Sequence, residues 1–256
     1  MITINNYVKV SSLQEAYELN QKRTNRVLGG MMWLRLGAGR VQTAIDLSGL
    51  GLDYIEEDEE EFRIGAMCTL RELELHEGLA RYFDGAVKES VRHIVGVQFR
   101  NGATVGGSIF GRFGFSDVLT CFLAMDAYVE LYKGGIIPLK EFIQMKRDND
   151  ILVSIHVKKD QRKVVYMSER AAATDFPLVA CAVAIEGEKI FCSVGARPMK
   201  AILLEDVCPK KEEAGDFARK SAKAVPFGSN MRAGAAYRRQ IAGVLIRRGI
   251  EKIMEG

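Results

Sequence analysis

The sequence predicts an α+β protein built from two domains, and three observations support this prediction. A chain of 256 residues has room for one large domain or two of ordinary size. Hydrophobic residues make up 48% of the chain and charged residues 27%, as in a globular protein with a sizeable core. Strand and helix patterns lie on both sides of a charged turn at 158–162. We therefore expect one domain at 1–158 and a second at 159–256.

Capping boxes indicate where two helices of the first domain begin. In the segment Ser12-Leu-Gln-Glu15, a serine hydroxyl and a glutamate satisfy free N–H groups at a helix start, and the helix should run to about Lys22. Thr69-Leu-Arg-Glu72 repeats the pattern and begins another helix. Between them, apolar runs predict strands at 26–28, 42–47 and 62–67, with an acidic turn at 56–61 before the last of them.

Further elements are expected along the rest of the chain. A helix at 117–125 should precede strands at 127–132, 151–157 and 163–167, then a hairpin of 179–185 and 189–194 and a closing helix from about Ala235. The closing helix has apolar residues at helical spacing, which we expect to face the core, namely Tyr237, Ile241, Val244, Leu245 and Ile253. Its cations should lie mainly elsewhere on its circumference, namely Arg238, Arg239, Arg247, Arg248 and Lys252.

Composition and charge exclude several classes of function. A net charge of +3, spread evenly, does not indicate nucleic-acid binding. No apolar run is long enough for a membrane span, and the polar N-terminus lacks the pattern of a signal peptide, so we expect a cytoplasmic protein. Five cysteines with no Cys-x-x-Cys pair predict buried reduced thiols rather than disulfides or a metal or iron–sulfur site. The three histidines are scattered, and we assign them neither a catalytic role nor a metal.

The segment from Phe99 to Asp117 is the most informative for function. Glycines and small residues between Gly102 and Ser108 allow successive backbone N–H groups to converge on one point, which suits a diphosphate. The Asp117 carboxylate is then available to accept hydrogen bonds from ribose hydroxyls. The alternative is an ordinary glycine-rich turn between two apolar strands.

This segment resembles the flavoprotein subunit of the molybdenum hydroxylases, the family of xanthine dehydrogenase, carbon monoxide dehydrogenase and nicotinate dehydrogenase. In that family an Arg-Asn-x-Ala-Thr-Ile/Val-Gly-Gly-Asn-Ile motif leads to Ser/Ala-Asp, and Arg100–Ile109 and Ser116-Asp117 follow it with Ser108 in place of the asparagine. Other family landmarks occur in the same order, namely Val8–Ala16, Val27–Gly30, Ile45–Leu47, Ile64–Ala66 with Thr69-Leu70, Arg170 with Asp175, and Tyr237–Arg239 with Arg247-Arg248.

The resemblance implies a fold and a cofactor. The fold is a two-subdomain FAD-binding domain of the PCMH/vanillyl-alcohol-oxidase-like type, with subdomains at about 1–55 and 56–158, followed by a small α/β C-terminal domain like that of the carbon monoxide dehydrogenase flavoprotein. FAD is the implied cofactor. The resemblance places its contacts at Leu28, Gly29, Gly30, Met31, Met32 and Trp33, at Gly102, Ala103, Thr104, Gly106, Gly107 and Ser108, and at Ser116 and Asp117.

Each of these positions also has a structural interpretation. The glycines can form plain turns, Ser116 or Asp117 can cap a helix, and Trp33 can belong to the core instead of stacking on a flavin. Two positions depart from the family: Met31-Met32 replaces polar residues of the first glycine loop, and Met167 stands where a lysine is common. Binding at the first loop must therefore depend on backbone N–H groups.

The function implied is that of an FAD-binding electron-transfer subunit of a heteromeric molybdenum hydroxylase of the xanthine dehydrogenase type. A large subunit would hold the molybdopterin and a small one the iron–sulfur clusters, and electrons would pass through FAD to NAD or another acceptor. Such a flavin needs no catalytic residue from this chain. Two alternatives remain open: a stand-alone flavin oxidase, and a scaffold subunit that has lost FAD.

Overall fold

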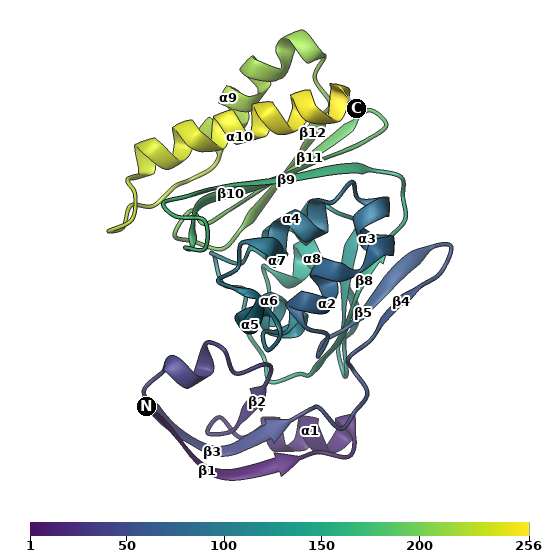
Figure 1. The fold of residues 1–256 in the computed structure, drawn as a ribbon, viewed down its shortest axis with the longest axis vertical. Coiled ribbons are helices and arrows are strands. Elements are labelled where there is room, and N and C mark those ends of the chain that lie inside the picture. The colour runs from purple at the N-terminus through teal and green to yellow at the C-terminus, as the bar shows by residue number, and fades with distance from the viewer. Residues whose placement is uncertain (256) are drawn as a thin grey trace.

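The computed structural model describes residues 1–255 and shows three tiers, each built around its own β-sheet (Figure 1). The strand orders are β1-β3-β2 in the N-terminal tier, β4-β5-β8-β6-β7 in the central tier and β12-β11-β10-β9 in the C-terminal tier. Helices and strands are mixed along the chain, so the predicted α+β class is confirmed. The boundary at residue 158 stays a prediction. No helix among residues 1–255 is long and apolar enough to cross a bilayer.

The N-terminal tier is a small parallel sheet with one helix. Its elements are β1 (Ile2–Lys9), α1 (Leu13–Asn20), β2 (Arg26–Leu28), the short 3-10 helix η1 (Leu34–Leu36) and β3 (Gly39–Asp46). The side chain of Ser12 accepts a hydrogen bond from the backbone N–H of Glu15, which confirms the predicted start of α1. Ala16 of α1 packs in one cluster with Ile45 of β3, and β2 pairs with β3 in parallel.

The central tier is an antiparallel sheet with short helices gathered on one face (Figure 1). Its strands are β4 (Ile55–Glu57), β5 (Glu61–Gly65), β6 (Ala127–Leu131), β7 (Gly135–Pro138) and β8 (Leu152–Lys158). Its helices are α2 (Leu70–Leu75), α3 (Glu77–Tyr82), α4 (Ala86–Arg92), α5 (Val97–Arg100), α6 (Val105–Phe110), α7 (Asp117–Leu123) and α8 (Leu139–Phe142). The Thr69–Glu72 capping box is present at the start of α2, as predicted.

The C-terminal tier is an antiparallel sheet covered by two helices (Figure 1). Its elements are β9 (Lys163–Arg170), β10 (Pro177–Glu186), β11 (Lys189–Gly195), β12 (Ile202–Val207), the 3-10 helix η2 (Lys211–Glu213), α9 (Ala214–Ala224) and α10 (Ala235–Glu255). The predicted hairpin is confirmed, and Gly187 takes the left-handed φ of +56° that its turn needs. The other face of this sheet packs on α4 and α7, so the central and C-terminal tiers share a core.

Three expectations from the sequence need correction. The acidic segment 56–61 is not all turn, because Glu56 and Glu57 pair with β5 as part of β4. The glycine-rich segment does not lie between strands, because it begins in the loop after α5 and continues into α6. On α10, Tyr237 is exposed, whereas Arg238 is fully buried although we expected it away from the core.

Arg238 is buried because its guanidinium bonds the main chain of the C-terminal tier. It donates to the carbonyl oxygens of Leu178 and Ala196, the latter at 2.7 Å, and to Oδ1 of Asn230 at 2.6 Å. Arg238→Met should lower the free energy of unfolding by about 3 kcal/mol, because the substitution leaves these buried acceptors without donors. Arg239→Met, an exposed neighbour, is the control and should change it by less than about 0.5 kcal/mol in urea titrations. Equal effects of the two substitutions would contradict this role for Arg238.

Candidate cofactor-binding site

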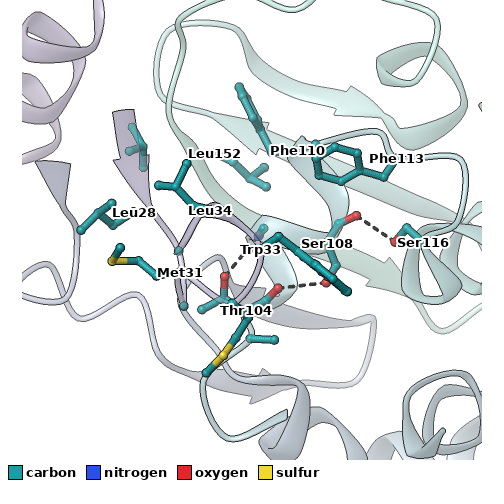
Figure 2. A pocket seen from close by; sticks show the side chains of 18 of the residues that line it. Leu28, Met31, Trp33, Leu34, Thr104, Ser108, Phe110, Phe113, Ser116 and Leu152 are labelled. Atoms are coloured by element: carbon teal, nitrogen blue, oxygen red, sulfur yellow. Dashed lines mark hydrogen bonds between the residues drawn. The ribbon is translucent and has the colours of Figure 1, made fainter. Parts of the chain in front are cut away.

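A cavity of 780 Å³ lies where loops of all three tiers meet (Figure 2). The N-terminal tier contributes the loop after β2, the central tier contributes α6, the loop before α7 and the segment before β8, and the C-terminal tier contributes the loop before β10. Of the fourteen residues assigned to cofactor binding, all except Gly102 line this cavity. The structure thus brings together two glycine loops that lie about seventy residues apart in the chain.

The loop after β2 has free backbone donors. Within residues 1–255, none of the amide N–H groups of 29–33 donates a hydrogen bond. Met31 takes a φ of 58°, in the left-handed region, where the chain turns back towards the cavity. Because consecutive unpaired amides attract anions, this loop has the features of a diphosphate cradle.

Glycine is required where the two loops touch. A Cβ atom on Gly30 would lie 1.3 Å from the carbonyl oxygen of Gly102, and one on Gly29 would lie 2.7 Å from Oγ1 of Thr104. A Cβ on Gly102 would lie 2.0 Å from the Cε of Met32, so Gly102 contacts the first loop, although it does not line the cavity. The close approach of the loops fixes the position of the free amides.

The second glycine loop uses most of its own amides to hold the fold. Thr104 caps α6 by accepting a hydrogen bond from the N–H of Gly107, 3.2 Å from Oγ1. The amide of Gly106 donates to Ala66 O at 2.9 Å, and that of Ser108 donates to Thr104 O at 3.1 Å. The structure therefore differs from the expectation that N–H groups converge on a ligand from this segment. This segment presents to the cavity the hydroxyl of Thr104 and glycines without side chains, which allow another group to approach the backbone closely.

Ser116 and Asp117 both have structural partners. Ser116 caps α7 by accepting from the N–H of Leu119, and its hydroxyl donates to Ser108 O at 2.9 Å, so the helix-cap alternative is confirmed for this residue. The carboxylate of Asp117 accepts from the Tyr166 hydroxyl and pairs with Arg170 at 2.5 Å. Burial raises the pKa of Asp117 to about 6, although the Arg170 charge opposes the shift. A sugar contact for Asp117 stays a prediction, and it would share the carboxylate with Arg170.

Trp33 belongs to the cavity wall and not to the core. Its side chain is 39% exposed and points from the first loop towards the segment of Ser108 and Ser116 (Figure 2). The indole stacks on Phe176 with ring centroids 5.1 Å apart and meets Phe99 and Phe115 edge-on. The aromatic side chains of this wall were missed in the prediction from sequence, although Phe113 and Phe115 lie inside the segment that carries the family motif.

None of the five cysteines lines the cavity. Cys68, Cys121, Cys181 and Cys192 are buried, as predicted, and burial raises the pKa of each thiol. Cys208 differs from the prediction, because it is only partly buried at the end of β12. Among residues 1–255 no group of three or more histidine, cysteine or acidic side chains is arranged to hold a metal ion.

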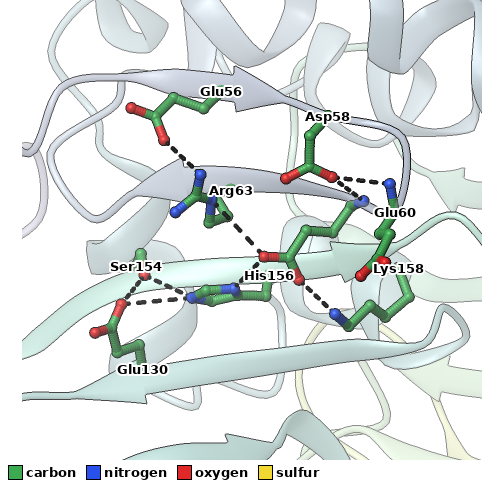
Figure 3. A network of polar contacts seen from close by, with 9 residues as sticks. Glu56, Asp58, Glu60, Arg63, Glu130, Ser154, His156 and Lys158 are labelled. Atoms are coloured by element: carbon green, nitrogen blue, oxygen red, sulfur yellow. Dashed lines mark hydrogen bonds and ion pairs between the residues drawn. The ribbon is translucent and has the colours of Figure 1, made fainter.

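His156 lies on the face of the central sheet opposite the short helices, in a network of polar side chains (Figure 3). Its Nδ1 lies 3.0 Å from Glu61 Oε1, and its Nε2 lies 3.0 Å from Ser154 Oγ. Lys158 pairs with the same glutamate at 2.7 Å. Glu130 of β6 joins the network by accepting from Ser154 Oγ at 2.6 Å, so it links β5, β6 and β8. None of these residues lines the cavity, and the network is therefore no part of the site.

The residues present fit a dinucleotide of the FAD type. The volume is that of a pocket for a large ligand, and one wall supplies free amides for a pyrophosphate. The opposite wall is apolar and includes Phe110, Phe113 and Leu152, which suits a planar ring system (Figure 2). The Cβ clashes at Gly29 and Gly30 show that the cradle exists only because these positions lack side chains.

Comparisons with known proteins agree with this geometry. Residues 3–158 match the family described as the FAD binding domain in molybdopterin dehydrogenase. The uncharacterized protein YgfM of Escherichia coli strain K12 is 27% identical over 250 residues, which cover 95% of this chain and 94% of that protein. The glyceraldehyde dehydrogenase medium chain of Sulfolobus acidocaldarius is 25% identical over 274 residues, covering 96% of this chain and 97% of that one.

The fold is also shared with solved structures. A chain of carbon monoxide dehydrogenase from Hydrogenophaga pseudoflava superposes with a TM-score of 0.82 at 21% identity, covering 96% of this chain and 95% of that chain. At this identity the likeness concerns the fold. It confirms the predicted α+β fold, like that of a chain of carbon monoxide dehydrogenase.

Proposed function

The chain belongs to the family of FAD-binding domains in molybdopterin dehydrogenases, and on this basis we propose that it is the electron-transfer flavoprotein subunit of a heteromeric molybdenum hydroxylase. FAD is the cofactor of this family. In the proposed role, the chain receives electrons from iron–sulfur clusters of a small partner subunit, which obtains them from a large molybdopterin subunit. It then passes them to NAD or to another acceptor.

The observation that carries the proposal is the free-amide loop, which contacts the second glycine loop at the wall of the cavity. We assign the pyrophosphate to the amides of 29–33, with the Thr104 hydroxyl as a further donor. Ser108, Ser116 and Asp117 line the side on which the sugar or ribityl hydroxyls would lie. When bound, FAD supplies redox chemistry that accepts electrons singly and releases them as a pair. The chain's own task is to bind and orient the cofactor and to limit its contact with water.

The two departures from the family pattern do not remove this capacity. Met31 and Met32 leave the backbone donors of their loop in place. Met167 packs against the core of the C-terminal tier and does not line the cavity, so a lysine is not missing from the wall. A scaffold without FAD has no need for a cradle that requires glycine at both Gly29 and Gly30.

Absorption spectroscopy of the purified chain tests the proposal. We expect about one FAD per chain after incubation with the cofactor, and quenching of the emission of Trp33, the only tryptophan. Bleaching of the bound flavin by NADH would support a nicotinamide acceptor, while unbleached flavin would point to a different one. A colourless chain that binds no FAD, even with its partner subunits present, would contradict the proposed function.

A further inference from the structure

Four aromatic side chains from all three tiers contact one another in the lining of the cofactor cavity. We call this group the aromatic clasp: Trp33 comes from the N-terminal tier, Phe99 and Phe115 from the central tier, and Phe176 from the C-terminal tier. All four line the cavity. Trp33 is 39% exposed and Phe115 36%, so the clasp lies at the surface and not in a core.

Contacts within the clasp bridge the tiers directly. Trp33 stacks on Phe176 at 5.1 Å and 29°, and Phe176 meets Phe115 edge-on at 4.8 Å. Trp33 also meets Phe99 at 5.2 Å and Phe115 at 6.0 Å. Such pairs are attractive beyond the burial of their area. The N-terminal and C-terminal tiers thus touch in the cavity wall through Trp33 and Phe176.

The loop that presents Phe176 is itself held by charge. Asp175 pairs with Arg232 at 2.7 Å, and the Arg232 guanidinium lies 5.0 Å from the centre of the Phe176 ring. Arg170 donates to the carbonyl oxygen of Asp175 at 2.6 Å and pairs with Asp117 of the cavity wall. Phe176 is therefore fixed in position, whereas Trp33 sits in a loop whose amides are unpaired.

We propose that Trp33 and Phe176 are positioning residues whose contact closes the cofactor cavity and controls the exchange of FAD. This inference rests on the proposed function, because FAD is the ligand that the cavity holds. In this proposal a dinucleotide that lies between the tiers enters and leaves past the paired rings, so opening the Trp33–Phe176 contact is part of both binding and release. It follows that a residue outside the matched segment 3–158 determines how the FAD-binding domain keeps its cofactor.

The test measures both rate constants of FAD exchange in the full chain. Phe176→Ala and Trp33→Ala should each increase the rate constant of release about tenfold and that of association at least about threefold. A substitution that merely loosens the site would raise release and leave association unchanged, so the two rates together separate a gate from a weakened contact. Trp33→Phe keeps an aromatic ring, so its rate constants of FAD release and association should lie between those of the wild type and Trp33→Ala. This variant keeps the test decisive if the alanine variant misfolds.

Tyr237→Ala is the control. Tyr237 is another exposed aromatic residue, 42% accessible on α10, and it does not line the cavity. Its substitution should change both rates by less than about twofold. Release and association rates of Phe176→Ala equal to those of the wild type, with FAD bound to both, would overturn the clasp alone. A wild-type chain that binds no FAD would overturn the clasp together with the proposed function.

Discussion

Replacing Gly30 by alanine is expected to weaken FAD binding more than a hundredfold, which corresponds to about 3 kcal/mol. The added Cβ atom would lie 1.3 Å from the carbonyl oxygen of Gly102 and 2.9 Å from the amide nitrogen of Ala103. Both are backbone atoms, which cannot turn aside as a flexible side chain can. The two glycine loops must therefore separate, and the amides of 29–33 lose the position from which they would bind a pyrophosphate.

Gly96→Ala is the matched control for this substitution. Gly96 precedes α5, a Cβ atom added to it would meet no other atom within 4 Å, and its φ of −148° is extended backbone. Its substitution should leave the Kd for FAD within about twofold of the wild-type value. Circular dichroism and thermal unfolding of both variants separate loss of binding from loss of fold. Tight binding of FAD by a folded Gly30→Ala chain would contradict the proposed cradle.

Replacing Arg170 by glutamine is expected to lower the free energy of unfolding by about 3–5 kcal/mol at pH 7.5. Within residues 1–255, Arg170 is the only cation paired with Asp117, whose side chain is 6% exposed, so the substitution leaves a buried carboxylate. Arg232→Gln provides the comparison, because its ion pair with Asp175 is about one third exposed and should contribute less than about 1 kcal/mol.

The effect of Arg170→Gln should depend on pH in a defined direction. Burial already raises the pKa of Asp117 to about 6 from an ordinary value of 3.8, so between these values the folded state holds a proton that the unfolded state has released. Stability contributed by this group therefore falls as the pH rises through that window. Loss of Arg170 raises the pKa further, so the penalty of the substitution should be largest at pH 7.5 and smallest near pH 4. Urea titrations at the two pH values check this, and a penalty that grows on acidification would contradict it.

Local signals in the sequence were sufficient for many elements of the fold. Capping boxes at Ser12 and Thr69 each begin a helix, because side-chain partners for the first N–H groups are encoded within four residues. Elements that depend on distant partners were not predicted. The strand β4 forms because 55–57 pair with β5, and Arg238 is buried because carbonyl oxygens of β10 and of the chain after β11 accept its hydrogen bonds.

The candidate site also combines features that could be predicted from the sequence with features that depend on the folded chain. The two glycine loops were predicted through the family resemblance, and the structure brings them into contact. Which loop has free donors could not be predicted, because the amides of 106 and 108 are taken up by Ala66 and Thr104 only in the folded chain. Nor could the pairing of Trp33 with Phe176, which are separated by more than a hundred residues and meet only when three tiers assemble.

A crystal structure of the chain with bound FAD would decide whether the loop after β2 is the diphosphate cradle. We expect the pyrophosphate to lie within hydrogen-bond distance of the amide nitrogens of 29–33, with Thr104 beside it. FAD bound elsewhere on the chain, or with its pyrophosphate away from that loop, would show that the cradle is wrongly assigned.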